Sequence, residues 1–487
     1  MAISILHLHA QKQSTEPLFD RILYHLSMDR SFSYICADVK KRAYFLSVVS
    51  ELTDDRSEIL YRQAIVKDFE RNPTLLEQLA SLSARFETLR ESQKTAGRDE
   101  YRLNATDTAS TETAKNILQT QALCLKRALL FIKAYGELLT KYDLQSQGLK
   151  NLRSACKEAY ENPDFTRLVT FCSKYESFSA VGHWDFKLSL NGEGRIAACE
   201  LIDHKYIHVT DPELKRKGFL PFKKSEDGGA LCQRLSPAKD GLYERLAVFA
   251  LSELSAAFAK ISEQIFEKFG LLDSELVFYE VALRYVQSLT EKKVPLCYPT
   301  LSEDRSITVK NLYDLYLLMT KHNPSGIIPN DFVMSEDNGG LLVLGDNGSG
   351  KTVYLRSIGS MQLLAQAGLP IACEHAEIAL FSQLATQFSE SEKEFCEGND
   401  AGRFEQEVRE LAAMADTLKE GALVFLNETF QTTAYAEGAE GLYHLLQHFS
   451  ALNIRWILVS HLRQLAPRLE GNGTLILHTA DGYRVQG

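Results

Sequence analysis

The stretch GDNGSGKT, residues 345–352, decides how the C-terminal part of this chain folds. It fits the phosphate-binding pattern G-x-x-x-x-G-K-[ST] at every fixed position. The apolar run LLVL precedes it, and the helical pattern TVYLRSIGSMQLLAQAG overlaps its end. Backbone N–H groups of such a loop bind phosphate oxygens together with the N-terminus of the helix. The strand–loop–helix order therefore predicts a P-loop nucleotide-binding domain.

Each part of this loop has an expected task. Lys351 should reach the β- and γ-phosphates, and the Thr352 hydroxyl should be a ligand of Mg²⁺. The predicted cofactors are therefore ATP and Mg²⁺. The residues expected to surround the nucleotide phosphates are Gly345, Asp346, Asn347, Gly348, Ser349, Gly350, Lys351, Thr352 and Val353.

Two later apolar runs, ALVFL and WILVS, end in polar residues that suit ATP hydrolysis. The first leads into Asn427 and Glu428, and the second leads into His461. Ligands bind at the carboxyl ends of strands in open parallel sheets, so these side chains should meet at the P-loop. Glu428 is the expected base, with His461 and Lys351 as catalytic partners. Asn427 can hold Mg²⁺ only through water and adds no charge, which predicts weaker metal binding.

The rest of the chain separates into regions by its periodicity. Residues 1–175 and 236–298 are mostly helical in pattern, residues 176–235 contain short alternating runs, and residues 299–487 are α/β. DFKLSL and RIAACELI, joined by turn residues, predict a β-hairpin. A helix should begin at Ser236-Pro237 and end at Gly270. The polar segment 96–114 is expected to be a loop between two long helices.

The composition limits the class of protein. The chain has 487 residues, 45% of them apolar, and a formal net charge of −10. An acidic chain does not bind nucleic acid through its overall charge, so any DNA contact should be local. Its nine cysteines form no C-x-x-C pair, which favours reduced thiols in the cytoplasm. The sequence has no signal peptide and no run of about eighteen apolar residues, so we expect no membrane span.

Several segments around these residues resemble the MutS family of ABC-type ATPases. GIIPNDFVM precedes the P-loop and AQAGLPIACEHAEI follows its helix, both as in the family. GRFEQEVREL resembles the signature helix, and NETFQTTAYAEG resembles the Walker B and D-loop run. The resemblance is specific over residues 299–487. Upstream it is weaker but extends to LLDSELVFYEVALRYVQSL, which is similar to the family's returning lever helix.

The resemblance implies a multidomain fold. An α-helical core and lever arms carry a small β-rich clamp-like insertion, and an α/β P-loop domain of the ABC type follows. The corresponding ranges are 1–175 for the helical core and first lever arm, 176–235 for the clamp-like insertion, 236–298 for the returning lever helices and 299–487 for the ATPase domain.

The resemblance also implies a homodimer with two nucleotides at its interface. Gly402 and Arg403, on the signature helix, would act on the nucleotide of the partner subunit. Ile327 and His478 would lie on the two faces of the adenine. Nucleotide state would then move the lever arms and change the grip on DNA.

Three departures from the family pattern bear on function. Gly402 stands where the family has a serine, and Asn427 stands where it has an aspartate. A branch of shorter bacterial MutS-like proteins shares N-E-[ST]-F at the second position. The chain enters the helical pattern almost at once, so we expect neither the domain that wedges mismatched bases nor a C-terminal nuclease domain.

The most basic short segment of the chain lies in the clamp-like insertion. Its side chains could neutralise DNA phosphates of duplex or branched DNA without reading sequence. A solvated basic loop in an acidic protein is the alternative interpretation. The residues concerned are Lys215, Arg216, Lys217, Lys223 and Lys224.

The sequence therefore predicts an ATP-dependent DNA clamp that acts in DNA repair or recombination, in the cytoplasm and associated with the nucleoid. The alternative is a slowly hydrolysing nucleotide sensor or scaffold that recruits other proteins, which Gly402 and Asn427 favour and Glu428 and His461 oppose. An ABC transporter ATPase is disfavoured, because the LSGGQ signature is missing from the sequence.

Overall fold

The computed structural model describes residues 3–8, 19–104, 111–176, 182–190, 196–206, 223–224, 230–235, 241–389, 400–430, 435–480 and 482–486. The chain divides into two compact units. Unit 1 comprises Met1–Ile3, Gln78–Asp143 and Asn151–Asp273, and unit 2 comprises Ser4–Glu77, Leu144–Lys150 and Ser274–Gly487. Within the described residues, no helix is long and apolar enough to span a membrane.

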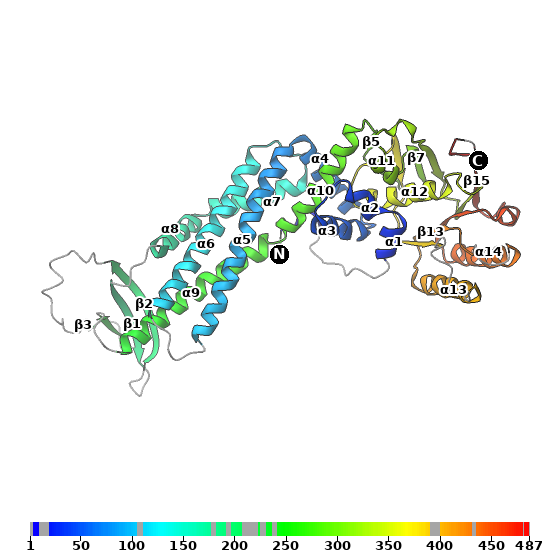
Figure 1. The fold of residues 1–487 in the computed structure, drawn as a ribbon. Coiled ribbons are helices and arrows are strands. Elements are labelled where there is room, and N and C mark those ends of the chain that lie inside the picture. Colours follow the sequence, from blue (N-terminus) through cyan, green and yellow to red (C-terminus); the bar gives the residue numbers. More distant parts are fainter. Residues whose placement is uncertain are drawn as a thin grey trace. The chain divides into compact units, whose positions relative to one another are not determined.

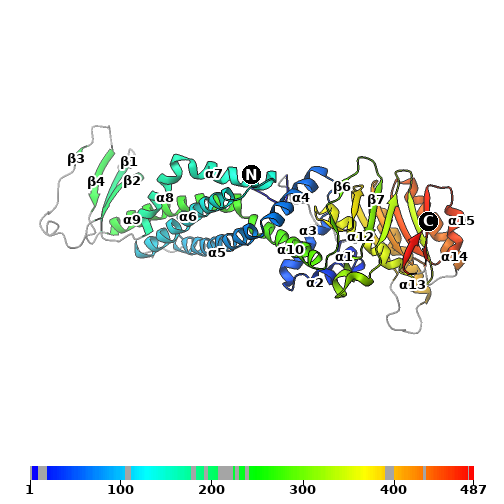
Figure 2. The same cartoon turned by 90° about the horizontal axis from the view of Figure 1, so that it is seen from above.

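Unit 1 is built from long helices and one small sheet. The helices α5 (Pro73–Asn104), α6 (Thr111–Thr140) and α9 (Gly241–Phe269) run side by side in Figures 1 and 2, with α8 (Pro163–Glu176) beside α6. The helix α7 (Gln147–Glu161) begins in unit 2. Leu118, Leu125, Tyr175 and Phe258 are among the buried residues of the unit 1 core. The end of α9 at Phe269 agrees with the predicted stop at Gly270, and its predicted start at Ser236-Pro237 lies outside the described residues.

The predicted loop at 96–114 is wrong over most of its length. The helix α5 continues to Asn104, and α6 already begins at Thr111. Ala96, Arg98 and Glu100 in this segment are strong helix formers, so its polar composition is compatible with a helix as well as with a loop.

The β-hairpin prediction is confirmed. Strands β1 (Gly182–Leu190) and β2 (Ile196–Tyr206) pair antiparallel, and the sheet order is β2-β1-β4-β3. The other two strands are β4 (Ala230–Leu235) and the short β3 (Lys223–Lys224).

Unit 2 contains a six-stranded sheet in the order β12-β13-β14-β9-β15-β16. Adjacent strands are parallel from β12 to β15, and β16 pairs antiparallel with β15. The strands β9, β13 and β14 are buried at every residue, as expected for parallel strands covered on both faces. Their bounds are β12 (Gln383–Phe388), β13 (Ala422–Asn427), β14 (Arg455–Ser460), β9 (Gly340–Leu344), β15 (Thr474–Ala480) and β16 (Arg484–Gln486).

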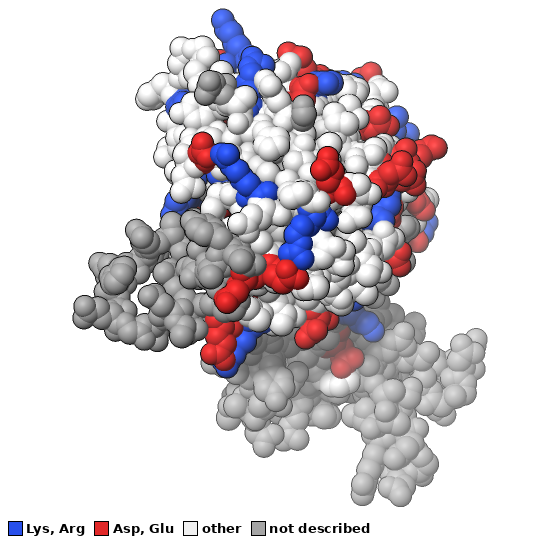
Figure 3. Space-filling model, turned by 90° about the vertical axis from the view of Figure 1, so that its right-hand side faces the viewer, with Lys and Arg blue, Asp and Glu red and all other residues white. Residues whose placement is uncertain are grey.

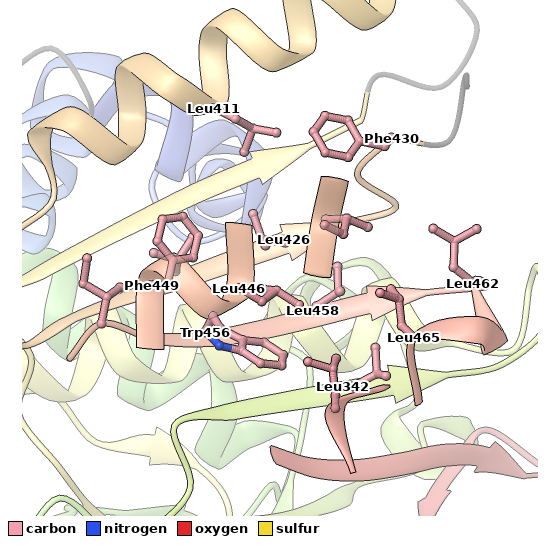
Figure 4. Close-up of a cluster of buried hydrophobic side chains, with 14 of the residues drawn as sticks. Leu342, Leu411, Leu426, Phe430, Leu446, Phe449, Trp456, Leu458, Leu462 and Leu465 are labelled. Carbon is pink, nitrogen blue, oxygen red and sulfur yellow. The ribbon is translucent and has the colours of Figure 1, made fainter. Parts of the chain in front are cut away.

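Alternate residues of these strands enter one hydrophobic cluster, drawn in Figure 4. Leu342, Leu426 and Trp456 face this cluster together with apolar residues of α13 (Asp400–Thr417) and α14 (Tyr435–Ala451). The helix α12 (Lys351–Gln366) contacts β13 and β14 but contributes no residue to the cluster, so it covers the opposite face. Asn427 alternates with Leu426 and therefore faces α12.

Smaller elements of unit 2 frame this sheet. A four-stranded sheet has the order β6-β11-β7-β8, and β5 pairs with β10. The strands are β5 (Leu296–Cys297), β6 (Thr300–Leu301), β7 (Ile307–Leu312), β8 (Asn330–Met334), β10 (Ile371–Ala372) and β11 (His375–Ile378). The helices are α10 (Leu272–Glu291), α11 (Leu315–Thr320) and α15 (Ala466–Leu469).

The N-terminal helices of unit 2 pack directly on its C-terminal part. These helices are α1 (Phe19–His25), α2 (Met28–Ser33), α3 (Val39–Ser50) and α4 (Arg56–Arg71). Leu26 lies so close to Gly359 of α12 that a Cβ there would meet its side chain at 2.5 Å. Gln366 Nε2 donates to Thr53 O at 2.7 Å, and His25 Nδ1 lies 2.9 Å from Thr386 Oγ1 on β12. The helix α12 is therefore enclosed between the sheet and these helices.

Candidate nucleotide-binding site

The strand register brings the predicted site residues to one edge of the sheet. Asn427 of β13 pairs with Val459 of β14, and Ser460 of β14 pairs with Leu344 of β9. The three strands are parallel, so the residues that follow them emerge side by side. These are Glu428, His461 and the loop that begins at Gly345.

The glycines of this loop meet different steric demands. Gly348 and Gly350 have φ of +79° and +95°, in the left-handed region that favours glycine. Gly350 is the N-cap of α12, so the first N–H groups of the helix, which lack carbonyl partners within it, point into the loop. At Gly345 a Cβ would lie 1.8 Å from Thr479 Oγ1. The sequence pattern thus corresponds to a tight turn at a helix N-terminus, a geometry that suits an anion.

Lys351 is the centre of the site. Its side chain is only 4% exposed, and its Nζ donates to Gly345 O at 2.8 Å and Asp346 O at 2.9 Å. The same ammonium lies 3.2 Å from the Glu428 carboxylate. Both charges are largely buried and compensate one another, which such charges require.

Glu428 has a second partner in His461. Its Oε2 lies 2.8 Å from His461 Nδ1, so one carboxylate touches both the predicted lysine and the predicted histidine. Glu428 also has φ of +52°, a conformation that costs roughly 1–2 kcal/mol for a residue with a Cβ. Its backbone N–H still donates to Val459 O at 3.0 Å. Backbone strain of this kind is concentrated at functional sites.

Thr352 and Asn427 are hydrogen-bonded to each other. The Thr352 hydroxyl donates to Asn427 Oδ1 at 2.8 Å. In the described residues, no group of three or more His, Cys, Asp or Glu side chains could hold a metal ion. A hydroxyl and an amide oxygen fit a Mg²⁺ ion that keeps its water and phosphate ligands, rather than a cation held by protein carboxylates.

The predicted signature helix is α13. Glu407 Oε1 accepts from Gln387 Nε2 at 2.9 Å and from the Phe430 N–H at 3.2 Å, which joins α13 to the ends of β12 and β13. Gly402 and Arg403 lie in the first turn of α13, and the surroundings of both residues lie outside the described part of the chain. Their contact with a partner subunit stays a prediction.

The two residues expected at the adenine differ in exposure. His478 is exposed on β15, whereas Ile327 is only 4% exposed, beside Ile328, which is 38% exposed. Contact of either residue with adenine stays a prediction. Among the predicted DNA contacts, Lys223 and Lys224 form β3, which pairs with β4. Lys215, Arg216 and Lys217 lie outside the described residues.

Three further residues border the loop and were not singled out from the sequence. Thr479 Oγ1 donates to Ser349 Oγ at 2.8 Å, and the Tyr483 ring lies 3.3 Å from the position of a Cβ at Gly350. Arg463 lies 3.0 Å from the Asp346 carboxylate. Of these three residues, only Arg463 could have been suggested by its position in the sequence, two residues after His461.

Comparison with known proteins agrees with this geometry. The family model for MutS domain V matches residues 341–475, which include the loop, Glu428 and His461. The DNA mismatch repair protein MutS of Granulibacter bethesdensis is 28% identical over 177 residues, 36% of this chain and 19% of the relative. The endonuclease MutS2 of Shouchella clausii is 26% identical over 216 residues, 44% of this chain and 26% of the relative. The chain thus covers about a quarter or less of either relative. The segment that carries the candidate site is therefore similar to domain V of the MutS family.

Proposed function

We propose that this chain is a MutS-like ATPase that binds ATP at residues 345–352 and uses the nucleotide state to control its grip on DNA. The observation that carries the proposal is the contact of one carboxylate, Glu428, with both Lys351 and His461 at the carboxyl edge of a parallel sheet. A base, a phosphate-binding cation and an orienting imidazole at one sheet edge suit hydrolysis of a nucleotide.

Binding would begin with an exchange of partners at Lys351. Its Nζ donates to two carbonyl oxygens of the loop, and the phosphate oxygens of ATP can replace these acceptors. The N–H groups at the start of α12 would bind the same phosphates, with the favourable end of the helix dipole. Mg²⁺, when bound with the nucleotide, would neutralise phosphate charge, with Thr352 as the direct ligand and Asn427 acting through water.

Hydrolysis would depend on the release of Glu428 from Lys351. While Lys351 is paired with Glu428, the ammonium occupies one oxygen of the carboxylate that would act as the base. Phosphate binding draws the ammonium away and leaves Glu428 to take a proton from the attacking water. His461 Nδ1 holds the carboxylate oxygen at 2.8 Å, which fixes the direction of the base.

The dimer and the DNA contact belong to the same proposal. Support comes from the names of the relatives, a mismatch repair protein and an endonuclease of the MutS2 type. In Figure 3 acidic and basic side chains are interspersed on the face drawn, so the described residues offer no continuous basic surface there. The proposed DNA contact is the basic segment 215–224, which would bind phosphates without sequence preference. Gly402 and Arg403 would complete the site of a second copy, and the protein would act in the cytoplasm.

A second candidate function rests on Asn427. A hydroxyl–amide pair replaces the carboxylate that normally strengthens the Mg²⁺ site, so turnover could be slow and ATP binding itself the signal. The protein would then be a nucleotide sensor that recruits partner proteins.

The test is steady-state ATP hydrolysis with and without branched DNA, for the wild type, Glu428→Gln and the exposed control Glu470→Gln. We expect a dimer with ATP and Mg²⁺, turnover that DNA changes, and a loss of about 10²–10⁴-fold in Glu428→Gln with ATP still bound. The control should keep its activity. An unchanged rate in Glu428→Gln would place the base elsewhere. Absence of salt-sensitive DNA binding in every nucleotide state would refute the DNA clamp and favour the sensor.

A further inference from the structure

An exposed ion pair joins the two loops that border the candidate site. Arg463 Nη2 lies 3.0 Å from Asp346 Oδ1, and the two side chains are 76% and 86% exposed. Asp346 is the second residue of the phosphate-binding loop, and its backbone oxygen accepts from Lys351. Arg463 begins a short 3₁₀ turn two residues after His461. The pair therefore connects the loop after β9 with the loop after the neighbouring strand β14.

Stability does not explain this pair. An ion pair between exposed side chains contributes about 0–1 kcal/mol, since water screens it and both side chains lose freedom. The chain offers a contrast in Arg356 and Asp314, which form two hydrogen bonds of 2.8 and 2.7 Å with side chains only 13% and 2% exposed. That pair joins α12 to α11 and suits a structural role. The Arg463–Asp346 pair can exchange its partner at little cost.

The charged side chains around the loop form pairs of opposite charge. Lys351 is paired with Glu428, and Arg463 with Asp346, so each of these two cations has a carboxylate partner. A carboxylate on a phosphate-binding loop repels a phosphoryl group. The guanidinium that neutralises Asp346 prefers a phosphate, because two of its N–H groups match two phosphate oxygens. An added phosphate thus competes with Asp346 for Arg463.

We propose that Arg463 is the residue that distinguishes ATP from ADP: it leaves Asp346 and binds the terminal phosphate of the triphosphate, and Asp346 holds it aside when that phosphate is absent. The inference rests on the proposed binding of ATP at residues 345–352. Arg463 is within reach of the loop that surrounds the phosphates, and it follows the strand that supplies His461. Release of the terminal phosphate would return Arg463 to Asp346, so the loop after β14 would report the nucleotide state.

The experiment compares the dissociation constants of ADP and a non-hydrolysable ATP analogue, measured by titration calorimetry. The variants are Arg463→Ala, Asp346→Asn and, as a matched control, Arg167→Ala. Arg167 is another exposed arginine, on α8, where its Nη1 is paired with Asp164 at 3.0 Å and both side chains are 80% exposed. Substitution of exposed side chains leaves the fold intact.

Arg463→Ala should weaken the binding of the ATP analogue by about tenfold and the binding of ADP by less than about twofold, since a charge-assisted hydrogen bond to phosphate is lost. Asp346→Asn should strengthen binding of the analogue, because the competing carboxylate is gone. The control should match the wild type. An equal effect of Arg463→Ala on both nucleotides, or none on either, would overturn the inference, and so would weaker analogue binding in Asp346→Asn. A wild type that binds neither nucleotide would overturn the proposed function itself.

Discussion

Replacement of Gly340 by alanine should destabilise unit 2, because the added methyl group collides with a buried indole. Gly340 pairs with Trp456 across β9 and β14, and Trp456 is 1% exposed. A Cβ at Gly340 would lie 2.1 Å from Trp456 Cε2 and Cζ2. Figure 4 shows this indole within the cluster that the two strands share.

The size of the effect follows from these distances. Ordinary contact begins at 3.4 Å, so the indole would have to retreat by roughly 1.3 Å inside a packed core. Overpacking of this kind costs about 1–3 kcal/mol. Alanine recovers about 0.4–1 kcal/mol by restricting the unfolded chain. We therefore expect a net loss of about 1–2 kcal/mol in the free energy of unfolding.

Gly339 provides the matched control in the adjacent position. A Cβ there would meet only Ser450 Oγ, at 3.8 Å, so Gly339→Ala should be neutral or slightly stabilising. Urea unfolding would be followed by fluorescence in a Trp184→Phe background, in which Trp456 is the sole indole. Equal unfolding midpoints for the two alanine variants would refute the reasoning, since the indole would then have moved without cost.

Two further predictions concern other sites of unit 2. Asn427→Asp should lower the Mg²⁺ concentration for half-maximal ATP hydrolysis by about tenfold, because a carboxylate then faces the ion beside Thr352. A titration of activity with Mg²⁺ checks this prediction. An unchanged midpoint of the titration would contradict it. Cys297, a half-exposed residue of β5, should react with iodoacetamide at neutral pH, since a hydrogen bond with Cys373 lowers the pKa of its thiol to about 6. Alkylation measured by mass spectrometry should rise with pH to half its limit near pH 6, while the pKa of the buried Cys373 thiol is raised and that residue should stay unmodified at neutral pH.

The local part of the site could be predicted from sequence. Runs of buried residues ending at the P-loop, at Glu428 and at His461 correspond to β9, β13 and β14. Each prediction used only neighbouring residues, together with the rule that parallel strands present their carboxyl ends at one edge. The direct contact between Glu428 and Lys351 could not be predicted, because it depends on the strand order and register.

Contacts across long sequence separations were missed for the same reason. The Thr479 hydroxyl is hydrogen-bonded to Ser349, which lies 130 residues earlier in the sequence. The residues around Thr479 do not indicate this partner. The pattern of residues 1–175 predicts helices, but not that the first of them pack on α12. The prediction of a loop at 96–114 was wrong because a polar segment of good helix formers has a composition similar to that of a loop.

The division of unit 2 along the chain sets the order of events during synthesis. Residues Ser4–Glu77 belong to the same compact unit as Ser274–Gly487, and all of unit 1 from Gln78 onward is translated between them. Leu26 and Thr53 find their partners on α12 only after those later residues leave the ribosome. At about 5–20 residues per second, translation of the roughly 300 residues from the end of α4 at Arg71 to the end of α12 at Gln366 takes about 15–60 s. During that interval the apolar faces of the first helices are uncovered, so the nascent chain should be a substrate for chaperones that bind exposed hydrophobic segments.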